Sequence, residues 1–385
     1  MDDELRQYDA IRPYEPEELP EVYDKLLQDE NFLKVVNYVL PGIPLEVVRQ
    51  QLYSCKTSLE FQKKFCYSFL ERVVKESATS LEGDFSALDV TKNYTFISNH
   101  RDIVLDSAFL DKLLIDAGFS NTCEIAIGDN LFGQPWIRDF VRLNKSFVVE
   151  RGLGMREMLV ASQRLSRYMH YSITKKKENI WIAQREGRAK DSNDKTQESV
   201  LKMIAMGGDG SVVQRLKEMH IVPLAISYEY DACDYLKAKE FQQKRDDKEW
   251  RKTKADDILS MATGFKGFKG RIVYKAAPCI DSFLDTLPED MPKTEVFEKI
   301  AQHIDEAIYD NYNLYPCNYI ALDLLEGTGE YRKYYTQEEK TAFVDYINQQ
   351  IDKVDLVRKD EAFLEERLLT MYANPARNQL RQRKD

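Results

Sequence analysis

Short apolar runs alternate with amphipathic stretches of helical period along the middle of the chain, from about residue 86. The runs are rich in Val, Ile and aromatic residues, which predicts strands at residues 94–97, 124–127, 146–150, 179–183, 221–228 and 271–276. Between them, apolar residues recur three and four positions apart. This spacing predicts helices at residues 102–117, near 135–141, and at 155–170, 197–205 and 212–219. The alternation predicts an α/β fold with a largely parallel sheet covered by helices.

Both flanks of this region show a helical pattern without strands. Residues 1–85 are predicted to form a helical N-terminal region, in which Phe61, Phe65, Phe69 and Val73 share one face that must be buried. The α/β domain is expected over 86–280, and a helical C-terminal region over 281–385. Residues 234–254 are dense in Lys, Glu, Asp and Gln, which predicts a charged, solvated helical insertion at about 234–260 within the α/β domain.

Composition narrows the class of protein. A net charge of −10 over 385 residues argues against a nucleic-acid partner. Six cysteines lie far apart without a Cys-x-x-Cys pair, so neither a metal site nor a disulfide framework is predicted, and a reducing cytosol is expected. The acidic start is not a secretory signal, and no apolar run reaches the roughly 18 residues of a membrane span. We expect a cytoplasmic protein, at most peripheral on the inner face of the cell membrane.

The strongest candidate for chemistry is the junction after the strand at 94–97. His100 follows the strand end and precedes a helix, a position at which open α/β sheets bind ligands. Helical side chains lean toward the helix N-terminus, so Asp106, one turn into the helix, is placed to reach His100. Asp102 is predicted to cap the helix. A His held by an Asp is a general base.

Three further junctions carry polar residues after a predicted strand. Arg151 ends one strand and precedes a glycine and a helix, which is typical of an anion site. In the next block, Arg185-Glu-Gly-Arg188-Ala-Lys190, three cations and Glu186 follow a buried strand directly. The fourth, after Val222-Pro223, indicates a core strand with a polar exit.

In this order the blocks resemble the glycerolipid acyltransferases, the glycerol-3-phosphate and lysophosphatidate acyltransferases that carry a His-x4-Asp signature. Asn99-His100 with Asp106 corresponds to the first motif, residues 147–151 to the second, Arg185-Glu-Gly-Arg188 to the third, and Val222-Pro223 with Ile226-Ser-Tyr-Glu229 to the fourth. The resemblance covers about residues 86–230. It implies that 86–280 is an acyltransferase domain in which His100 and Asp106 are catalytic. Arg151, Arg188, Glu186 and Lys190 would then bind substrate.

The chain departs from the family pattern in two places. Five residues separate His100 from Asp106 where the family has four, so either the loop carries one extra residue or Asp102 partners His100; we favour Asp106. In the third block, either Glu186-Gly187 aligns with the family's Glu-Gly or Arg188 aligns with its Arg. A substrate-binding role is therefore better supported for Arg188 than for Glu186.

The resemblance implies transfer of a fatty acyl group from acyl-CoA or acyl-carrier protein to glycerol-3-phosphate or lysophosphatidate. No cofactor or metal is expected beyond these substrates. Two alternatives remain open: an acceptor that is not a phosphoglycerol, and a family member that binds lipid or anions without catalysis. Peripheral membrane contact is expected through residues 264–271, where Phe265 and Phe268 lie among Lys266, Lys269 and Arg271. The basic tail from Arg377 to Lys384 is expected to add to that contact.

Overall fold

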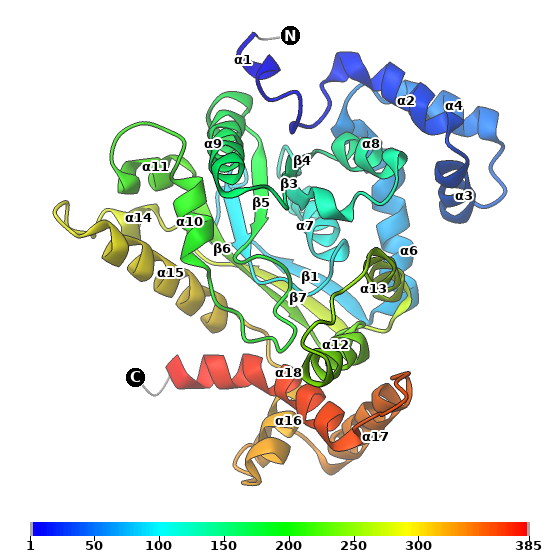
Figure 1. The fold of residues 1–385 in the computed structure, drawn as a ribbon, viewed down its shortest axis with the longest axis vertical. Helices are drawn as coiled ribbons and strands as arrows, with labels where there is room; N and C mark the ends of the chain where they lie inside the picture. The colour runs from blue at the N-terminus through cyan, green and yellow to red at the C-terminus, as the bar shows by residue number, and fades with distance from the viewer. Residues whose placement is uncertain (1–2, 383–385) are drawn as a thin grey trace.

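A seven-stranded sheet forms the centre of the computed structural model, which describes residues 3–382 (Figure 1). The strand order is β1-β7-β6-β2-β5-β3-β4, and all pairs are parallel except β6 with β7. The strands are β1 (Ser80–Asp84), β2 (Thr95–Ser98), β3 (Cys123–Gly128), β4 (Ser146–Val149), β5 (Asn179–Ala183), β6 (Ile221–Tyr228) and β7 (Arg271–Ala276). The predicted α/β class and its largely parallel sheet are confirmed.

Helices cover both faces of the sheet, as a mostly parallel sheet requires. One face packs against α9 (Met155–Tyr171), α10 (Glu198–Ile204), α11 (Val212–Glu218), α14 (Asp281–Leu284) and α15 (Lys293–Asp310). The opposite face packs against α6 (Tyr67–Ser77) and α7 (Leu105–Asp116). The central strand β2 is buried along its whole length, and its residues Phe96 and Ile97 contribute to the two opposite cores.

The N-terminal helices form a separate apolar cluster beside the sheet. It joins α2 (Leu19–Gln28), α3 (Glu30–Val39), α4 (Leu45–Ser54) and α5 (Ser58–Phe61) to α8 (Pro135–Leu143). The short α1 (Asp3–Arg6) precedes them. A third group of helices packs around its own core at the other end of the molecule (Figure 1): α12 (Asp234–Asp246), α16 (Pro316–Glu326), α17 (Gln337–Asp352) and α18 (Glu361–Gln382).

Two predictions about elements were wrong. Residues 80–84 form β1, parallel to β7, although they were assigned to the helical N-terminal region. This edge strand has the sequence Ser-Leu-Glu-Gly-Asp and lacks a buried face, so it carries no apolar alternation. The stretch 234–260 is helical, as α12 and part of α13 (Lys254–Lys266), but it is not simply solvated.

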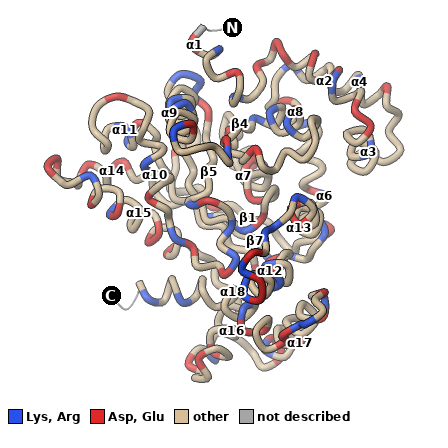
Figure 2. The backbone as a smooth tube through the Cα atoms, in the orientation of Figure 1, with Lys and Arg blue, Asp and Glu red and all other residues tan. Residues whose placement is uncertain are grey.

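The first of these two helices is buried despite its charge. Asp234, Lys237, Ala238, Glu240 and Gln242 are all buried, because α12 packs against α17 and α18. Its charged side chains find partners inside the protein, as described below. The stretch that joins α12 to α13 contains both basic and acidic residues (Figure 2), and this part agrees with the predicted charged surface.

Candidate active site

All four polar junctions recognised in the sequence meet at one edge of the sheet. β2, β4, β5 and β6 run parallel to one another within the sheet, so their carboxyl ends lie together. The residues that follow those ends are His100 after β2, Arg151 after β4, the Arg185–Lys190 block after β5 and Glu229 after β6. In open α/β sheets this edge is the usual place for a ligand.

His100 and Asp106 are in direct contact. The Nδ1 atom of His100 lies 2.7 Å from Oδ2 of Asp106. Because a carboxylate only accepts hydrogen bonds, Nδ1 carries the proton in the neutral imidazole and Nε2 is left with a lone pair. The described residues give Nε2 no hydrogen-bond partner, and the His100 side chain, 14% exposed, lines a large cavity.

Asp106 is fully buried in the first turn of α7 and is held by more than the imidazole. Its Oδ2 atom also accepts hydrogen bonds from the backbone N–H groups of Arg101, at 2.6 Å, and Asp102, at 3.0 Å. The dipole of α7 favours a negative charge at this position. The carboxylate therefore fixes both the loop and the imidazole that the loop carries.

The extra residue between His100 and Asp106 is taken up by a turn before the helix. The Oδ1 atom of Asp102 accepts hydrogen bonds from the N–H groups of Val104, at 2.9 Å, and Leu105, at 2.8 Å, so Asp102 caps the helix. Leu105, which stands where the family pattern has Asp, is fully buried in the apolar core. The expected contact is thus made by Asp106.

Two residues that were not among the predicted site residues hold the His100 loop in place. The buried side chain of Asn99 exchanges two 2.8 Å hydrogen bonds with the backbone of Ile226 on β6. The indole of Trp181 on β5 packs edge to face against His100 and donates to Ser98 Oγ at 3.0 Å. The sequence signal for Asn99 was its place in the first motif, directly before His100. The Trp181 contact depends on strand order and has no local sequence signal.

A cavity of about 1750 Å³ opens beside His100 and has two kinds of wall. One wall is apolar and comes mainly from the N-terminal helices and α8: Phe32, Val36, Val48, Leu52, Phe61, Phe65, Phe69, Trp136 and Phe140. The other wall is polar and includes the predicted substrate-binding residues Arg151, Glu186, Arg188 and Lys190, together with Arg185. The predicted site residues therefore gather around one space, with Asp106 behind His100.

The polar residues differ in how far their charges are already neutralised. Arg151 forms an ion pair with the exposed Glu186, and Lys190 forms one with Glu240 of α12. Burial lowers the pKa of Lys190 to about 8, although Glu240 acts in the opposite direction. Arg188 forms no ion pair among the described residues, and its buried Nη1 has no hydrogen-bond partner there. Arg185, which also lines the cavity, forms no ion pair among the described residues either, so Arg185 and Arg188 are the two guanidinium groups of this wall without a carboxylate partner there.

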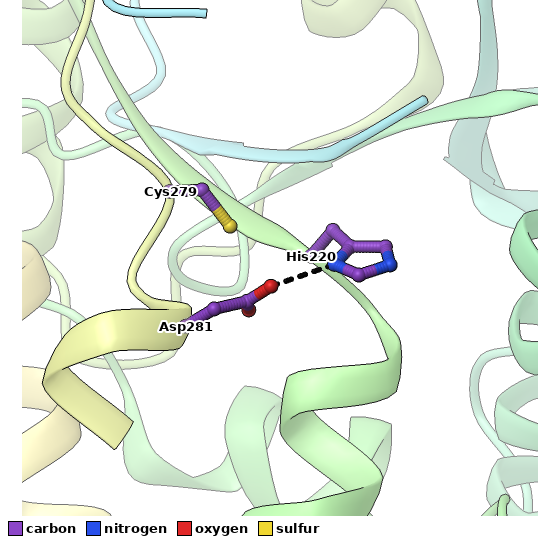
Figure 3. A group of neighbouring side chains, drawn as sticks. All are labelled: His220, Cys279 and Asp281. Carbon is purple, nitrogen blue, oxygen red and sulfur yellow. Dashed lines mark hydrogen bonds and ion pairs between the residues drawn. The ribbon is translucent and has the colours of Figure 1, made fainter. Parts of the chain in front are cut away.

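A second His–Asp pair lies at the opposite edge of the sheet. His220 precedes β6, and its Nδ1 atom lies 2.7 Å from Oδ2 of Asp281, with Cys279 beside them (Figure 3). This pair matches the distance between His100 and Asp106, but the His220 side chain is 49% exposed and does not line the large cavity. The two pairs thus differ in surroundings rather than in internal geometry.

Comparisons with known proteins point to the same region of the chain. Residues 74–227 match the family model described as Acyltransferase, and this segment contains His100, Asp106 and all four polar junctions up to Ser227. No curated protein matches the chain. Among solved structures it is similar to the 1-acyl-sn-glycerophosphate (LPA) acyltransferase PlsC from Thermotoga maritima. The identity is 11%, the match covers 75% of this chain and 95% of that chain, and the TM-score is 0.36.

The matched segment and the geometry coincide. Residues 74–227 carry the strands that position the site, the motif residues in the order of the family, and a His–Asp pair in contact beside a cavity. The protein is therefore an acyltransferase whose residues 74–227 match the family model of that name.

Proposed function

We propose that this acyltransferase is an O-acyltransferase of phospholipid synthesis. It transfers a fatty acyl group from acyl-CoA or acyl-carrier protein to glycerol-3-phosphate or lysophosphatidate. The observation that carries the proposal is the position of His100: its unpartnered Nε2 adjoins a cavity with an apolar wall on one side and guanidinium groups on the other.

His100 acts as the general base in this proposal. Its Nε2 takes the proton of the acceptor hydroxyl as that oxygen attacks the thioester carbonyl carbon. A C–O bond forms, the C–S bond breaks, and the imidazolium returns its proton to the leaving thiolate. Asp106 keeps the proton on Nδ1 before the reaction and stabilises the imidazolium during it. A positioned base of this kind contributes on the order of 10²–10⁴-fold to the rate.

The apolar wall suits the acyl chain. Aromatic and branched side chains from α3, α4, α6 and α8 extend the cavity away from His100, with few polar groups among them. Burying a fatty acyl chain against such surface is favourable by roughly 0.8 kcal/mol per methylene. The N-terminal helices, on this account, hold the acyl donor.

The polar wall suits a phosphate. Arg188 has an unpartnered, buried guanidinium nitrogen and is our first choice for binding the acceptor phosphate, since Arg meets phosphate in a fixed two-pronged geometry. Arg151 and Lys190 are proposed to assist, each after exchanging a carboxylate partner for the ligand. Glu186 is proposed to orient Arg151 rather than to touch the phosphate, because like charges repel.

The ion pairs also favour a second candidate. With Arg151 and Lys190 both neutralised by carboxylates, the site suits a lipid alcohol without phosphate better than a fully cationic pocket would. An acyltransferase for such an acceptor keeps the same base and the same apolar wall.

We further propose that the mouth of the cavity faces a membrane. Tyr38 of α3, Met158 of α9 and Ile258 of α13 are exposed and also line the cavity, and the exposed Met155, Leu159 and Leu259 lie beside them on α9 and α13. The exposed Lys254 and Lys266 lie at the same mouth, suited to anionic headgroups. No described helix is long and apolar enough to cross a bilayer, so this contact is peripheral in the proposal.

This surface replaces the loop predicted from sequence. The prediction for residues 264–271 was wrong for Phe265 and Lys269, whereas Arg271 is exposed, as the prediction requires. Phe265 packs against Phe69, Lys269 is fully buried, and Arg271 forms an ion pair with Glu229. In the basic tail, Arg377 pairs with Glu326, and Arg383 and Lys384 lie outside the described residues.

A screen of acceptors tests the proposal. Radiolabelled acyl-CoA or acyl-carrier protein is offered with glycerol-3-phosphate, lysophosphatidate or a non-phosphorylated lipid alcohol. Transfer to a phosphorylated acceptor that weakens in the Arg188→Ala variant, through a higher KM for the acceptor, supports the first candidate. Transfer only to the unphosphorylated alcohol supports the second, and thioester stability with every acceptor contradicts both.

A further inference from the structure

The residue after His100 is held at three points by buried partners. The backbone N–H of Arg101 donates to Asp106 Oδ2, and its carbonyl oxygen accepts from the Nζ atom of Lys237 at 3.0 Å. Its guanidinium donates two hydrogen bonds to Asp194, at 2.9 and 2.6 Å. Arg101, Lys237 and Asp194 are all buried. Both peptide groups that flank the Cα atom of Arg101, and its side chain, are therefore held by hydrogen bonds.

The partners come from parts of the chain that lie outside the His100 motif. Lys237, only 2% exposed, belongs to α12 and also forms an ion pair with Asp231. Asp194 lies in the loop after β5. Its carboxylate accepts a hydrogen bond from the hydroxyl of Tyr312, and its backbone carbonyl oxygen accepts one from the hydroxyl of Tyr309. The charged insertion and the C-terminal region thus both contact the segment that carries the base.

Buried ion pairs of this kind are a poor source of stability, because desolvation cancels most of their attraction. Such ion pairs instead fix the geometry of the groups that they join, because few arrangements satisfy all of the buried hydrogen bonds at once. Catalysis by a positioned base is sensitive to such geometry, and a misplacement of about 1 Å can cost about 100-fold in rate.

We propose that Lys237 and Asp194 are positioning residues for His100. Lys237 holds the backbone carbonyl of Arg101 and Asp194 holds its guanidinium, and together they keep the imidazole aligned with Asp106 and the substrate. This inference rests on the proposed role of His100 as the general base. Neither residue is expected to touch substrate, since neither lines the large cavity.

The test compares Lys237→Met with Lys145→Met in the full-length protein. Lys145 is a matched control: it is also buried, and its Nζ also bonds one carboxylate, Glu178 at 2.7 Å, and one carbonyl, Thr122 at 3.1 Å. It precedes β4 and so lies at the sheet edge opposite His100. Both variants are expected to lower the melting temperature, but only Lys237→Met is expected to lower kcat, by about 10- to 100-fold, with both KM values nearly unchanged.

The NMR resonance of the His100 Nδ1 proton reports the alignment of His100 independently of turnover. Because Nδ1 of His100 donates to Asp106, its proton should give a downfield resonance in wild-type protein and in Lys145→Met. We expect that resonance to be lost or broadened in Lys237→Met. This readout tests the positioning of His100 even if no acyl transfer is detected, so it fails independently of the proposed function.

A milder pair of variants decides the case if Lys237→Met does not fold. Tyr312→Phe removes one hydroxyl that holds Asp194, whereas Tyr168→Phe removes an equally buried hydroxyl that donates to Glu124 at 2.6 Å. Tyr312→Phe is expected to lower kcat several-fold and to weaken the His100 resonance, and Tyr168→Phe to do neither. A wild-type kcat and an unchanged resonance in Tyr312→Phe, or in a folded Lys237→Met, would overturn the proposal.

Discussion

Asp102 and Asp106 lie four positions apart in one buried turn, yet their surroundings assign them different tasks. Asp106 directs one oxygen at the imidazole, whereas Asp102 directs one at the N–H groups of Val104 and Leu105, where α7 begins. Burial raises the pKa of Asp102, and the nearby charge of Asp106 raises it further. A carboxyl group that resists ionisation is a poor stabiliser of an imidazolium. The geometry and the raised pKa of Asp102 therefore both argue against Asp102 as the partner of His100.

This difference predicts a ranking of two matched variants. Asp106→Asn should lower kcat by on the order of 10²–10⁴, because an amide does not hold the proton on Nδ1 or stabilise the imidazolium. Asp102→Asn keeps an oxygen for the helix cap and should cost about 1 kcal/mol of stability or less, with turnover near that of wild type. Steady-state kinetics on both variants, with melting curves to confirm folding, measure the ranking. The reverse order would give the partner role to Asp102.

At the residue scale, the sequence predicted which residues lie at the site, but it did not predict which carboxylates pair with its cations. His100 and Asp106 belong to a local motif, so their contact followed from helix geometry. The ion pairs of Arg151 and Lys190 were not predicted, because Glu186 and Glu240 belong to other elements. Only the folded chain shows that these two cations are already neutralised and that Arg188 is not.

The strands of the sheet were predicted correctly where burial requires a clear pattern of apolar residues in the sequence. Residues 179–183, 221–228 and 271–276 are strands with the predicted bounds, because β-branched and aromatic residues are concentrated in them. β1 was missed because an exposed edge strand has no such run. The insertion was judged solvated from its charge, but α12 is buried by helices more than 100 residues later in the chain. Composition alone does not reveal such long-range partners.

The first turns of α9 supply the sharpest test of the proposed membrane face. Met155 and Leu159 are one turn apart and are 93% and 58% exposed, a costly arrangement unless something covers them. Replacing both by Ser should reduce co-sedimentation with anionic vesicles at low salt, because the apolar contribution to binding is lost. Phe268→Ser, in the loop first predicted from sequence, is the control and should sediment as wild type does. Equal sedimentation of the double Ser variant would exclude α9 from the membrane face.

At the scale of the whole molecule, the two flanking regions do more than cover the domain. On the predicted face of residues 61–73, Phe61 and Val73 are buried, but Phe65 and Phe69 are only half-buried and form part of the cavity wall. The C-terminal helices close over α12, where Asp234 accepts hydrogen bonds from Tyr346 and Tyr372, each at 2.7 Å. An amphipathic pattern predicts that a face is buried; it does not tell whether the face encloses a core or a ligand.

The buried carboxyl of Asp234 makes the stability of the protein depend on pH. Burial, and to a lesser extent Asp231, raise the pKa of Asp234 to about 7 from its ordinary value of 3.8, against the hydrogen bonds from both tyrosines. The folded state therefore holds this proton more tightly than the unfolded state between these two values, and stability falls as pH rises through that window. Asp234→Asn has no such proton. The free energy of unfolding of wild type relative to Asp234→Asn should drop by roughly 1–3 kcal/mol from pH 5 to pH 8.

Urea unfolding of both proteins at the two pH values measures this difference. A difference that stays constant, or that moves in favour of wild type as pH rises, would show that Asp234 does not retain its proton in the folded protein.

The central claim is that His100 is the base of an acyl transfer, and it is tested most directly by comparing His100→Ala with His220→Ala. Both variants remove a His that contacts an Asp at 2.7 Å, but His220 lies at the opposite edge of the sheet, away from the cavity. We predict that His100→Ala loses acyl transfer by at least about 100-fold while its melting curve stays close to that of wild type, and that His220→Ala keeps wild-type turnover. A folded His100→Ala variant with more than a few per cent of wild-type activity would contradict the account.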